Sequence, residues 1–174
     1  MAVAVQDRIP NGKSTATMAR VAVLMGGDSQ ERTVSFETGR AVLEALRGAG
    51  VKAYAYDPKE TTFGEMLKWS PTTAFLALHG RGGEDGTIQR RLEAMGVRYT
   101  GSGPDASAVA MDKELTKKAF QRHSIPTAPY RILHREDLDR AEEICEGLGS
   151  PVVVKPACEG SSIGVSVAHH RFEL

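Results

Sequence analysis

The sequence has no excess charge of either sign, because its 22 Lys and Arg residues balance its 22 Asp and Glu residues. This balance excludes the bulk electrostatic attraction by which strongly basic proteins bind nucleic acids or anionic membranes. Cysteine is scarce: Cys145 and Cys158 form neither a CxxC pair nor a disulfide framework, so we expect reduced thiols. The opening apolar residues are too few for a secretory signal or a membrane span. We therefore predict a cytoplasmic protein with neither a nucleic-acid nor a membrane partner.

Two common nucleotide-binding motifs are also missing. The glycine turn after the first predicted strand lacks the GxGxxG pattern of dinucleotide-binding folds. Gly12-Lys13-Ser14 imitates the end of a P-loop, but Asp7 stands where the first glycine belongs and no strand precedes it. His169-His170 lacks the Cys or acidic neighbours of a metal site, so we assign no metal ligand. Residues 1–19 have no apolar periodicity and are expected to form a flexible extension.

What the chain does contain is an alternation of strands and helices. The apolar run Arg20–Met25 ends at Gly26-Gly27, and helical spacing of apolar residues follows as far as Gly48. Val51–Tyr56 is a second strand, so the three elements form a βαβ unit that implies a parallel sheet. Thr73–Leu78 is a third, buried strand. Further along, the sequence predicts a short helix at Phe63–Trp69, a helix opened by Pro104, a linker at Ile125–Pro129, a strand at Tyr130–Leu133 and a helix at Arg135–Gly147.

Polar residues gather where these strands end. Glu31 lies at the start of the first helix, where a carboxylate is either a cap for free amide donors or a ligand for a cation. His79 opens a four-glycine loop at the carboxyl end of a strand, which is where open α/β sheets bind ligands, although a hydrogen-bonded structural histidine is the alternative. Lys113 follows a predicted helix, and nearby Lys117 and Lys118 are expected to be solvated.

The segment PVVVKPACEGSSIG, residues 151–164, has the character of a phosphate site. Val152–Val154 is expected to be a short, fully buried strand that delivers Lys155 at its end. An ammonium group suits a phosphate oxygen, and the Gly and Ser residues of 160–164 let backbone N–H groups converge on an anion. The alternative is a simple Gly/Ser turn in a hairpin that pairs Val152–Lys155 with Val165–Ala168.

Taken in order, these segments resemble the D-alanine–D-alanine ligases, the ATP-dependent enzymes that make the dipeptide of bacterial peptidoglycan. The resemblance is carried by five motifs: GGDSQERTVS (26–35), ALHGRGGEDGT (77–87), YTGSG (99–103), MDK (111–113) and VVKPACEGSSIGVS (153–166). It implies an α/β fold, with a parallel-sheet, Rossmann-like amino-terminal (pre-ATP-grasp) domain over residues 20–112. The beginning of an ATP-grasp domain would occupy residues 113–174.

The resemblance also implies roles for individual residues. The first D-alanine would be bound by Glu31, Val34, Ser35 and His79, with Glu31 holding its ammonium group. ATP phosphates would be bound by Lys113, Lys155, Glu159, Gly160, Ser161 and Ser162. Glu31 and Ser161 would be the catalytic pair, joined by hydrogen bonds. Cys158 replaces a polar or basic residue that is frequent in the family, and we interpret it as filler rather than a reactive thiol.

The family implies ATP and Mg²⁺ as cofactors, D-alanine as substrate and a homodimeric assembly. The magnesium ligands are expected beyond Leu174, so we expect the 174-residue chain alone not to synthesise D-alanyl-D-alanine. The same reasoning predicts that the apolar faces of 152–154 and 165–167 are exposed. Two alternatives remain: a non-catalytic fragment that serves in substrate binding and dimerisation, and another ATP-grasp carboxylate–amine or D-alanyl ester ligase.

Overall fold

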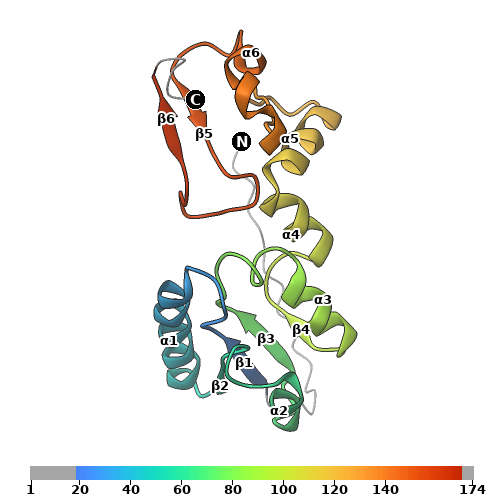
Figure 1. Ribbon diagram of the computed structural model, residues 1–174. Helices are drawn as coiled ribbons and strands as arrows, with labels where there is room; N and C mark the ends of the chain where they lie inside the picture. Colours follow the sequence, from blue (N-terminus) through green and yellow to red (C-terminus); the bar gives the residue numbers. More distant parts are fainter. Residues whose placement is uncertain (1–18, 170–174) are drawn as a thin grey trace, which may run out of the picture.

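A computed structural model describes residues 19–169 of the chain. Its first unit is built on a parallel sheet with strand order β2-β1-β3-β4 (Figure 1). The strands are β1 (Arg20–Leu24), β2 (Lys52–Tyr56), β3 (Thr73–Leu76) and β4 (Arg98–Tyr99). The expected parallel α/β arrangement is thus confirmed, and β1, which carries the first glycine turn, lies inside the sheet.

Both faces of this sheet are buried, so side chains that alternate along a strand enter two different cores. Ala22 and Leu24 of β1 pack into one core together with Met66 and Leu92, whereas Val23 and Met25 pack into the other. The first core is covered by α2 (Phe63–Lys68) and α3 (Thr87–Ala94), and the second by α1 (Arg32–Gly48). This burial on both faces explains why the strands have nearly continuous apolar sequences.

Local sequence signals define where the helices begin and end. Thr62 and Glu65 form a reciprocal capping box at the start of α2, in which each side chain accepts a backbone N–H of the other residue. Pro104 opens α4 (Pro104–Met111), as expected from its fixed φ and missing N–H. Asp112 ends α4 and caps α5 (Lys113–Arg122) by accepting the N–H groups of Glu114 and Leu115.

The second unit follows α5 and consists of short elements. It contains the 3-10 helix η1 (Arg135–Arg140), α6 (Ala141–Cys145) and an antiparallel hairpin of β5 (Val152–Val154) and β6 (Ser166–Ala168). Figure 1 shows the loop between these two strands reaching down toward the first unit. In the described part of the chain, no helix combines the length and the apolar character needed to cross a membrane.

The structure corrects several predictions from the sequence. Residues 130–133 are not a strand, and the helix predicted over 135–147 divides into η1 and the short α6. The expected hairpin pairing is confirmed for 152–154 and 166–168, which leaves open whether the loop between them binds a phosphate. The strand β5 is not fully buried, because Val153 is 49% exposed. The expected exposure of the hairpin is confirmed by Val165 and Val167 as well.

Lys117 is not the solvated helix residue that the sequence indicated. Its ammonium group donates to Thr127 Oγ1 at 2.7 Å and to the Ala128 carbonyl at 2.9 Å, and it lies over the ring of Tyr130. The side chain therefore fixes the linker against α5. Lys118 is exposed as expected and pairs with Glu114 on the same helix.

Two glycines of α1 provide a test of how tightly this helix packs on the sheet. A Cβ added at Gly39 would lie 2.5 Å from Cβ of Met25, whereas one added at Gly48 would meet no atom within 4 Å. We expect Gly39→Ala to lower the free energy of unfolding by about 1–3 kcal/mol through overpacking. Gly48→Ala should leave it unchanged or raise it by about 0.5 kcal/mol, because alanine is the better helix former. Urea unfolding of both variants checks this, and equal midpoints would contradict the packing.

Candidate active site

The site is built where β1 and β3 end and α1 begins. Ser35, in the first turns of α1, is fully buried and accepts the N–H of Gly26 at 2.9 Å. Its hydroxyl donates to the carbonyl of Ala77 at 2.7 Å, so one side chain joins the ends of both strands to the helix. Ser35 consequently does not line a substrate pocket, contrary to its assignment from the sequence, because no part of it reaches the surface.

Glu31 is the residue that precedes α1, but its side chain forms no capping hydrogen bond. Ser29 takes that local role by accepting the N–H of Glu31 with its hydroxyl oxygen at 3.1 Å. The Glu31 carboxylate instead accepts a hydrogen bond from the hydroxyl of Ser161, 130 residues away in sequence. Of the two interpretations of Glu31, the structure thus excludes the cap, and it contains the hydrogen bond expected between these two residues.

His79 lies beside Glu31 at the end of the segment that follows β3. Its carbonyl accepts the hydroxyl of Ser29 at 2.7 Å, and its ring Nε2 lies 3.0 Å from Thr38 Oγ1 of α1. The next residue, Gly80, has φ of +69°, and an added Cβ would lie 2.5 Å from Oε2 of Glu31. Glycine is favoured here by its left-handed backbone, and a larger residue would also have to displace the end of the Glu31 side chain.

The loop of residues 159–164 brings the second unit to this carboxylate. Ser161 and Ser162 have φ of +46° and +59°, a region in which residues other than glycine are strained by about 1–3 kcal/mol each. Backbone hydrogen bonds from Ile163 to Gly160 and from Val165 to Ser162 hold this conformation. Gly160 lies close to Glu31, because a Cβ added there would be 3.7 Å from Oε2 of Glu31.

The two candidate phosphate lysines differ in their surroundings. Lys113 begins α5, and its ammonium group donates to the Glu159 carbonyl at 2.6 Å, while its backbone N–H donates to Ala157 at 2.9 Å. Lys155 is exposed and forms no hydrogen bond or ion pair within residues 19–169. Val34 is also exposed, on the first turn of α1.

The thiol of Cys158 lies just before this loop. Desolvation raises the pKa of Cys158, and the nearby Asp112 carboxylate raises it further. A thiol with a raised pKa is a poorer nucleophile at neutral pH because less of it is thiolate. This agrees with the interpretation of Cys158 as filler.

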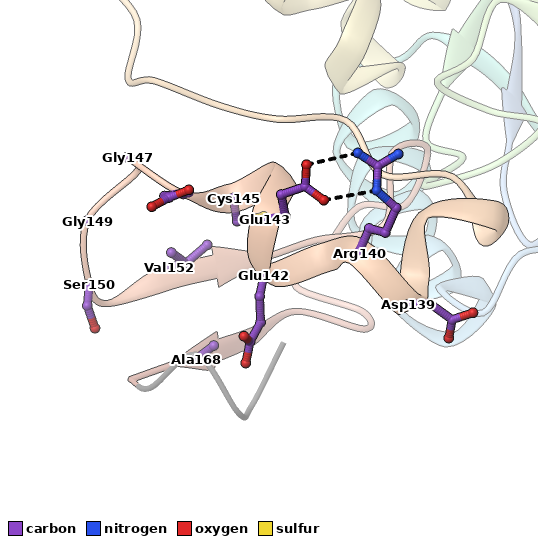
Figure 2. A pocket seen from close by; sticks show the side chains of 11 residues that line it. Asp139, Arg140, Glu142, Glu143, Cys145, Gly147, Gly149, Ser150, Val152 and Ala168 are labelled. Atoms are coloured by element: carbon purple, nitrogen blue, oxygen red, sulfur yellow. Dashed lines mark hydrogen bonds and ion pairs between the residues drawn. The ribbon is translucent and has the colours of Figure 1, made fainter.

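Two hollows lie in the surface of the described residues. A cavity of about 210 Å³ opens beside the ends of β1, β2 and β3 and is lined by Gly27, Ser29 and His79 among others. A larger hollow of about 640 Å³ lies between α6 and the β5–β6 hairpin. Figure 2 shows its wall with the Arg140–Glu143 ion pair. None of the candidate site residues lines the larger hollow, and of these residues His79 lines the smaller cavity.

A carboxylate buried under the glycine turn holds that turn in place. Asp57 accepts the N–H groups of Gly27 and Lys59 at 3.0 Å each and pairs with Arg32 at 2.7 Å. Burial alone would raise the pKa of Asp57, but the hydrogen bonds from Arg32, Gly27 and Lys59 outweigh it and hold the pKa below its ordinary value.

Of the residues that build the site, Thr38 was not identified from the sequence, whereas Ser29 and Glu84 were placed in the polar loops without a specific partner. Thr38 and Glu84 approach the His79 ring, and Ser29 connects the starts of both loops. A signal for Ser29 existed, since a serine two residues before a helix start commonly bonds the backbone. The sequence contained no comparable signal for Thr38, because its partner His79 is 41 residues away. The helix α3 and the strand β4, which close this side of the sheet, were missed as well.

Comparison with known proteins identifies relatives across most of the chain. A family model described as "D-ala D-ala ligase N-terminus" matches residues 57–102, and one described as "D-ala D-ala ligase C-terminus" matches residues 119–174. A D-alanine–D-alanine ligase of Polaromonas sp. is 48% identical over 158 residues, covering 90% of this chain and 47% of the relative. A D-alanine–D-alanine ligase of Acinetobacter baylyi is 50% identical over 154 residues, covering 88% of this chain and 48% of the relative.

Solved structures agree with the sequence relatives. The crystal structure of D-alanine–D-alanine ligase from Bacillus anthracis superposes with a TM-score of 0.72 at 34% identity, over 89% of this chain and 51% of that one. A structure of the same protein complexed with ATP gives a TM-score of 0.70 at 32% identity, over 89% and 52%. The chain spans about half the length of the relatives that it matches.

The low pKa of Asp57 predicts how stability responds to acid. A carboxyl group whose pKa is depressed by folding stabilises the protein above its unfolded pKa, near 3.9, and this contribution is lost as the pH falls through the folded value. We expect Asp57→Asn to lower the free energy of unfolding at pH 7 by about 1.5–3 kcal/mol, the range for hydrogen bonds to charged groups. Denaturant unfolding between pH 7 and pH 3 should show this deficit shrinking below about pH 4.

The control is Asp105→Asn, which removes a carboxylate whose side chain is 94% exposed and paired with Arg90 at the surface. This variant should stay close to the parent protein at every pH. A deficit for Asp57→Asn that is independent of pH would contradict a role for the ionised carboxylate.

Proposed function

The chain belongs to the D-alanine–D-alanine ligase family, and we propose that it supplies the first-substrate site and part of the ATP site of an enzyme that joins two D-alanines. In this proposal, residues 20–112 are the amino-terminal domain and residues 113–174 are the beginning of the ATP-grasp domain. The enzyme would act in the cytoplasm as a homodimer, in the synthesis of peptidoglycan precursor.

One contact carries the proposal: the hydrogen bond from Ser161 to Glu31. It joins a carboxylate at the end of the first strand–helix turn to a glycine-rich loop in the other unit. A carboxylate suits an ammonium group, and a loop of glycine and serine residues can present N–H and hydroxyl groups to a phosphate. An amino acid and a nucleotide can therefore react where the two units meet.

Glu31 would bind the ammonium group of the first D-alanine through a charge-assisted hydrogen bond. His79 and Val34 would lie against the same substrate, one beside Glu31 and the other on the exposed first turn of α1. Ser161 would close the loop over the bound molecule by keeping its hydrogen bond to Glu31. Holding the small substrate in one orientation is a large part of what such a site contributes to the rate.

Phosphate binding would fall to the two lysines and to the loop from Glu159 to Ser162. The ammonium group of Lys113 has three donors, and its bonds to the Glu159 and Ala157 carbonyls leave one for a phosphate oxygen. Lys155, which is exposed at the end of β5, would reach the same anion with a compact charge. The ATP complex of the Bacillus anthracis relative supports the use of this nucleotide.

The reaction would proceed in two balanced steps. The carboxylate of the first D-alanine attacks the γ-phosphorus of ATP, which forms an acyl phosphate and releases ADP. The amine of the second D-alanine then attacks the acyl carbon, the peptide bond forms, and inorganic phosphate leaves while the nitrogen gives up a proton. The lysines would stabilise charge on the transferring group throughout.

Magnesium is the ion that such phosphoryl transfers ordinarily use, and it would neutralise phosphate charge when bound. In the described stretch of 151 residues, from 19 to 169, no group of three or more His, Cys, Asp or Glu side chains is arranged to hold a metal ion. We therefore assign no magnesium ligand to these residues and derive no step through the metal.

The function is tested by joining this chain to the second half of the Acinetobacter baylyi relative and assaying the chimera with ATP, Mg²⁺ and D-alanine. We expect phosphate release that depends on D-alanine, together with formation of D-alanyl-D-alanine. A chimera that folds and binds ATP but forms no dipeptide would refute the proposal.

Within that chimera, Glu31→Gln should raise KM for the first D-alanine by roughly tenfold to a hundredfold and change KM for ATP little. The reason is the loss of a charge-assisted contact, which costs about 1.5–3 kcal/mol. Steady-state kinetics with each substrate varied in turn measure the effect. Glu37→Gln on the exposed side of α1 is the matched control and should behave as the parent does. An unchanged response to D-alanine would mean that Glu31 does not bind it.

Lys113→Ala and Lys155→Ala should each weaken ATP binding at least tenfold, because each removes a cation directed at phosphate. Calorimetric titration of the chimera with ATP measures the affinity. Lys118→Ala is the appropriate control, because Lys118 is exposed and pairs with Glu114 on its own helix. Lys117 is not a suitable control, because it holds the linker. Equal affinity in all three variants would exclude the lysines from the phosphate site.

A further inference from the structure

The imidazole of His79 is bounded by protein groups at both of its ring nitrogens. Nε2 lies 3.0 Å from the hydroxyl oxygen of Thr38 on α1. Nδ1 lies 3.9 Å from Oε1 of Glu84, in the loop that follows His79. The other carboxylate oxygen of Glu84 accepts the backbone N–H of Gly80 at 2.8 Å, which keeps this carboxylate directed at the ring.

The spacing of the two elements explains why Thr38 reaches this ring. Ser35 and Thr38 are three residues apart and therefore lie on one face of α1. Ala77 and His79 both lie in the segment that directly follows β3. Ser35 bonds the Ala77 carbonyl and Thr38 bonds the His79 ring, so the helix holds the end of the strand at two successive points.

These partners distinguish the two tautomers of the neutral ring. An ionised carboxylate can only accept a hydrogen bond, so the nitrogen that faces Glu84 is the better place for the ring proton. Nε2 then has a lone pair, and a hydroxyl group can donate to it. We infer that Thr38 is a positioning residue that, together with Glu84, holds His79 as the Nδ1–H tautomer with its ring in one orientation.

The contact between His79 and D-alanine rests on the proposed function, whereas the tautomer and orientation of the ring do not. With Nε2 bonded to Thr38 and Nδ1 facing Glu84, the ring is a fixed wall of the site and not a rotating group. Thr38→Val keeps the shape of the side chain but removes the donor, which frees the ring to turn and to adopt the tautomer that free histidine favours in water.

The decisive measurement is the tautomer of His79 in the 174-residue chain, read from ¹⁵N chemical shifts of its labelled ring at about pH 8.5, above the ordinary pKa of histidine. The His79→Gln variant assigns the signal among the five histidines. We expect Nδ1–H in the parent chain and in Thr38→Ser, and a shift toward Nε2–H in Thr38→Val. Thr33→Val makes the same change at an exposed position of the same helix and should leave the signal unchanged.

An Nε2–H tautomer in the parent chain, or the same spectrum for Thr38→Val and the parent, would overturn the inference. A change in Thr33→Val equal to that in Thr38→Val would also overturn it, because the effect would then come from the helix and not from the hydroxyl. Since this readout needs no substrate, it is independent of the proposed activity. In the active chimera, KM for D-alanine should rise several-fold in Thr38→Val and recover in Thr38→Ser; an unchanged KM with the expected tautomer shift would instead refute the substrate role of His79.

Discussion

The site depends on one buried hydroxyl group. Ser35 accepts a hydrogen bond from the turn after β1 and donates one to the segment after β3, and its own backbone N–H bonds the carbonyl of Glu31. Since a buried hydroxyl without partners is costly, these bonds leave few alternative positions for the helix start. The carboxylate of Glu31 lies close to Gly80 and accepts the hydroxyl of Ser161. A residue that never reaches the surface thus decides where the surface carboxylate lies.

The candidate site is shared by two units that are distant in sequence. Glu31 and Ser161 are separated by 130 residues, and their contact forms only when both units are folded. The loop that carries Ser161 stores backbone strain at two serines, and Lys113 secures its start through the Glu159 carbonyl. Strain that persists in a folded loop is a feature of sites arranged for a ligand, because the surrounding contacts keep it there.

The two units differ in how completely they are packed. The parallel sheet is covered on both faces, and residues such as Leu24 and Leu92 are fully buried. The β5–β6 hairpin instead leaves Val153, Val154 and Val167 partly open to solvent, beside the 640 Å³ hollow under α6. Exposed valines on a short hairpin form an apolar surface that can pack against other groups. This difference fits a chain that spans about half the length of its relatives.

The sequence by itself determined the first three strands of the first unit, the helices α1, α2 and α4, the parallel sheet and the positions of the polar loops, because apolar periodicity and glycine turns are local signals. It did not reveal α3 or the two-residue strand β4. The resemblance to the family added the roles expected for the residues in those loops. Tertiary structure alone decided that Glu31 turns away from its helix, that Ser35 is buried, that Lys117 holds the linker and that residues 130–133 form no strand. The physical reason is that a partner outside the local segment sets each of these outcomes. The partner of Ser35 is Ala77 and that of Glu31 is Ser161, and the local sequence around a residue does not indicate such distant partners.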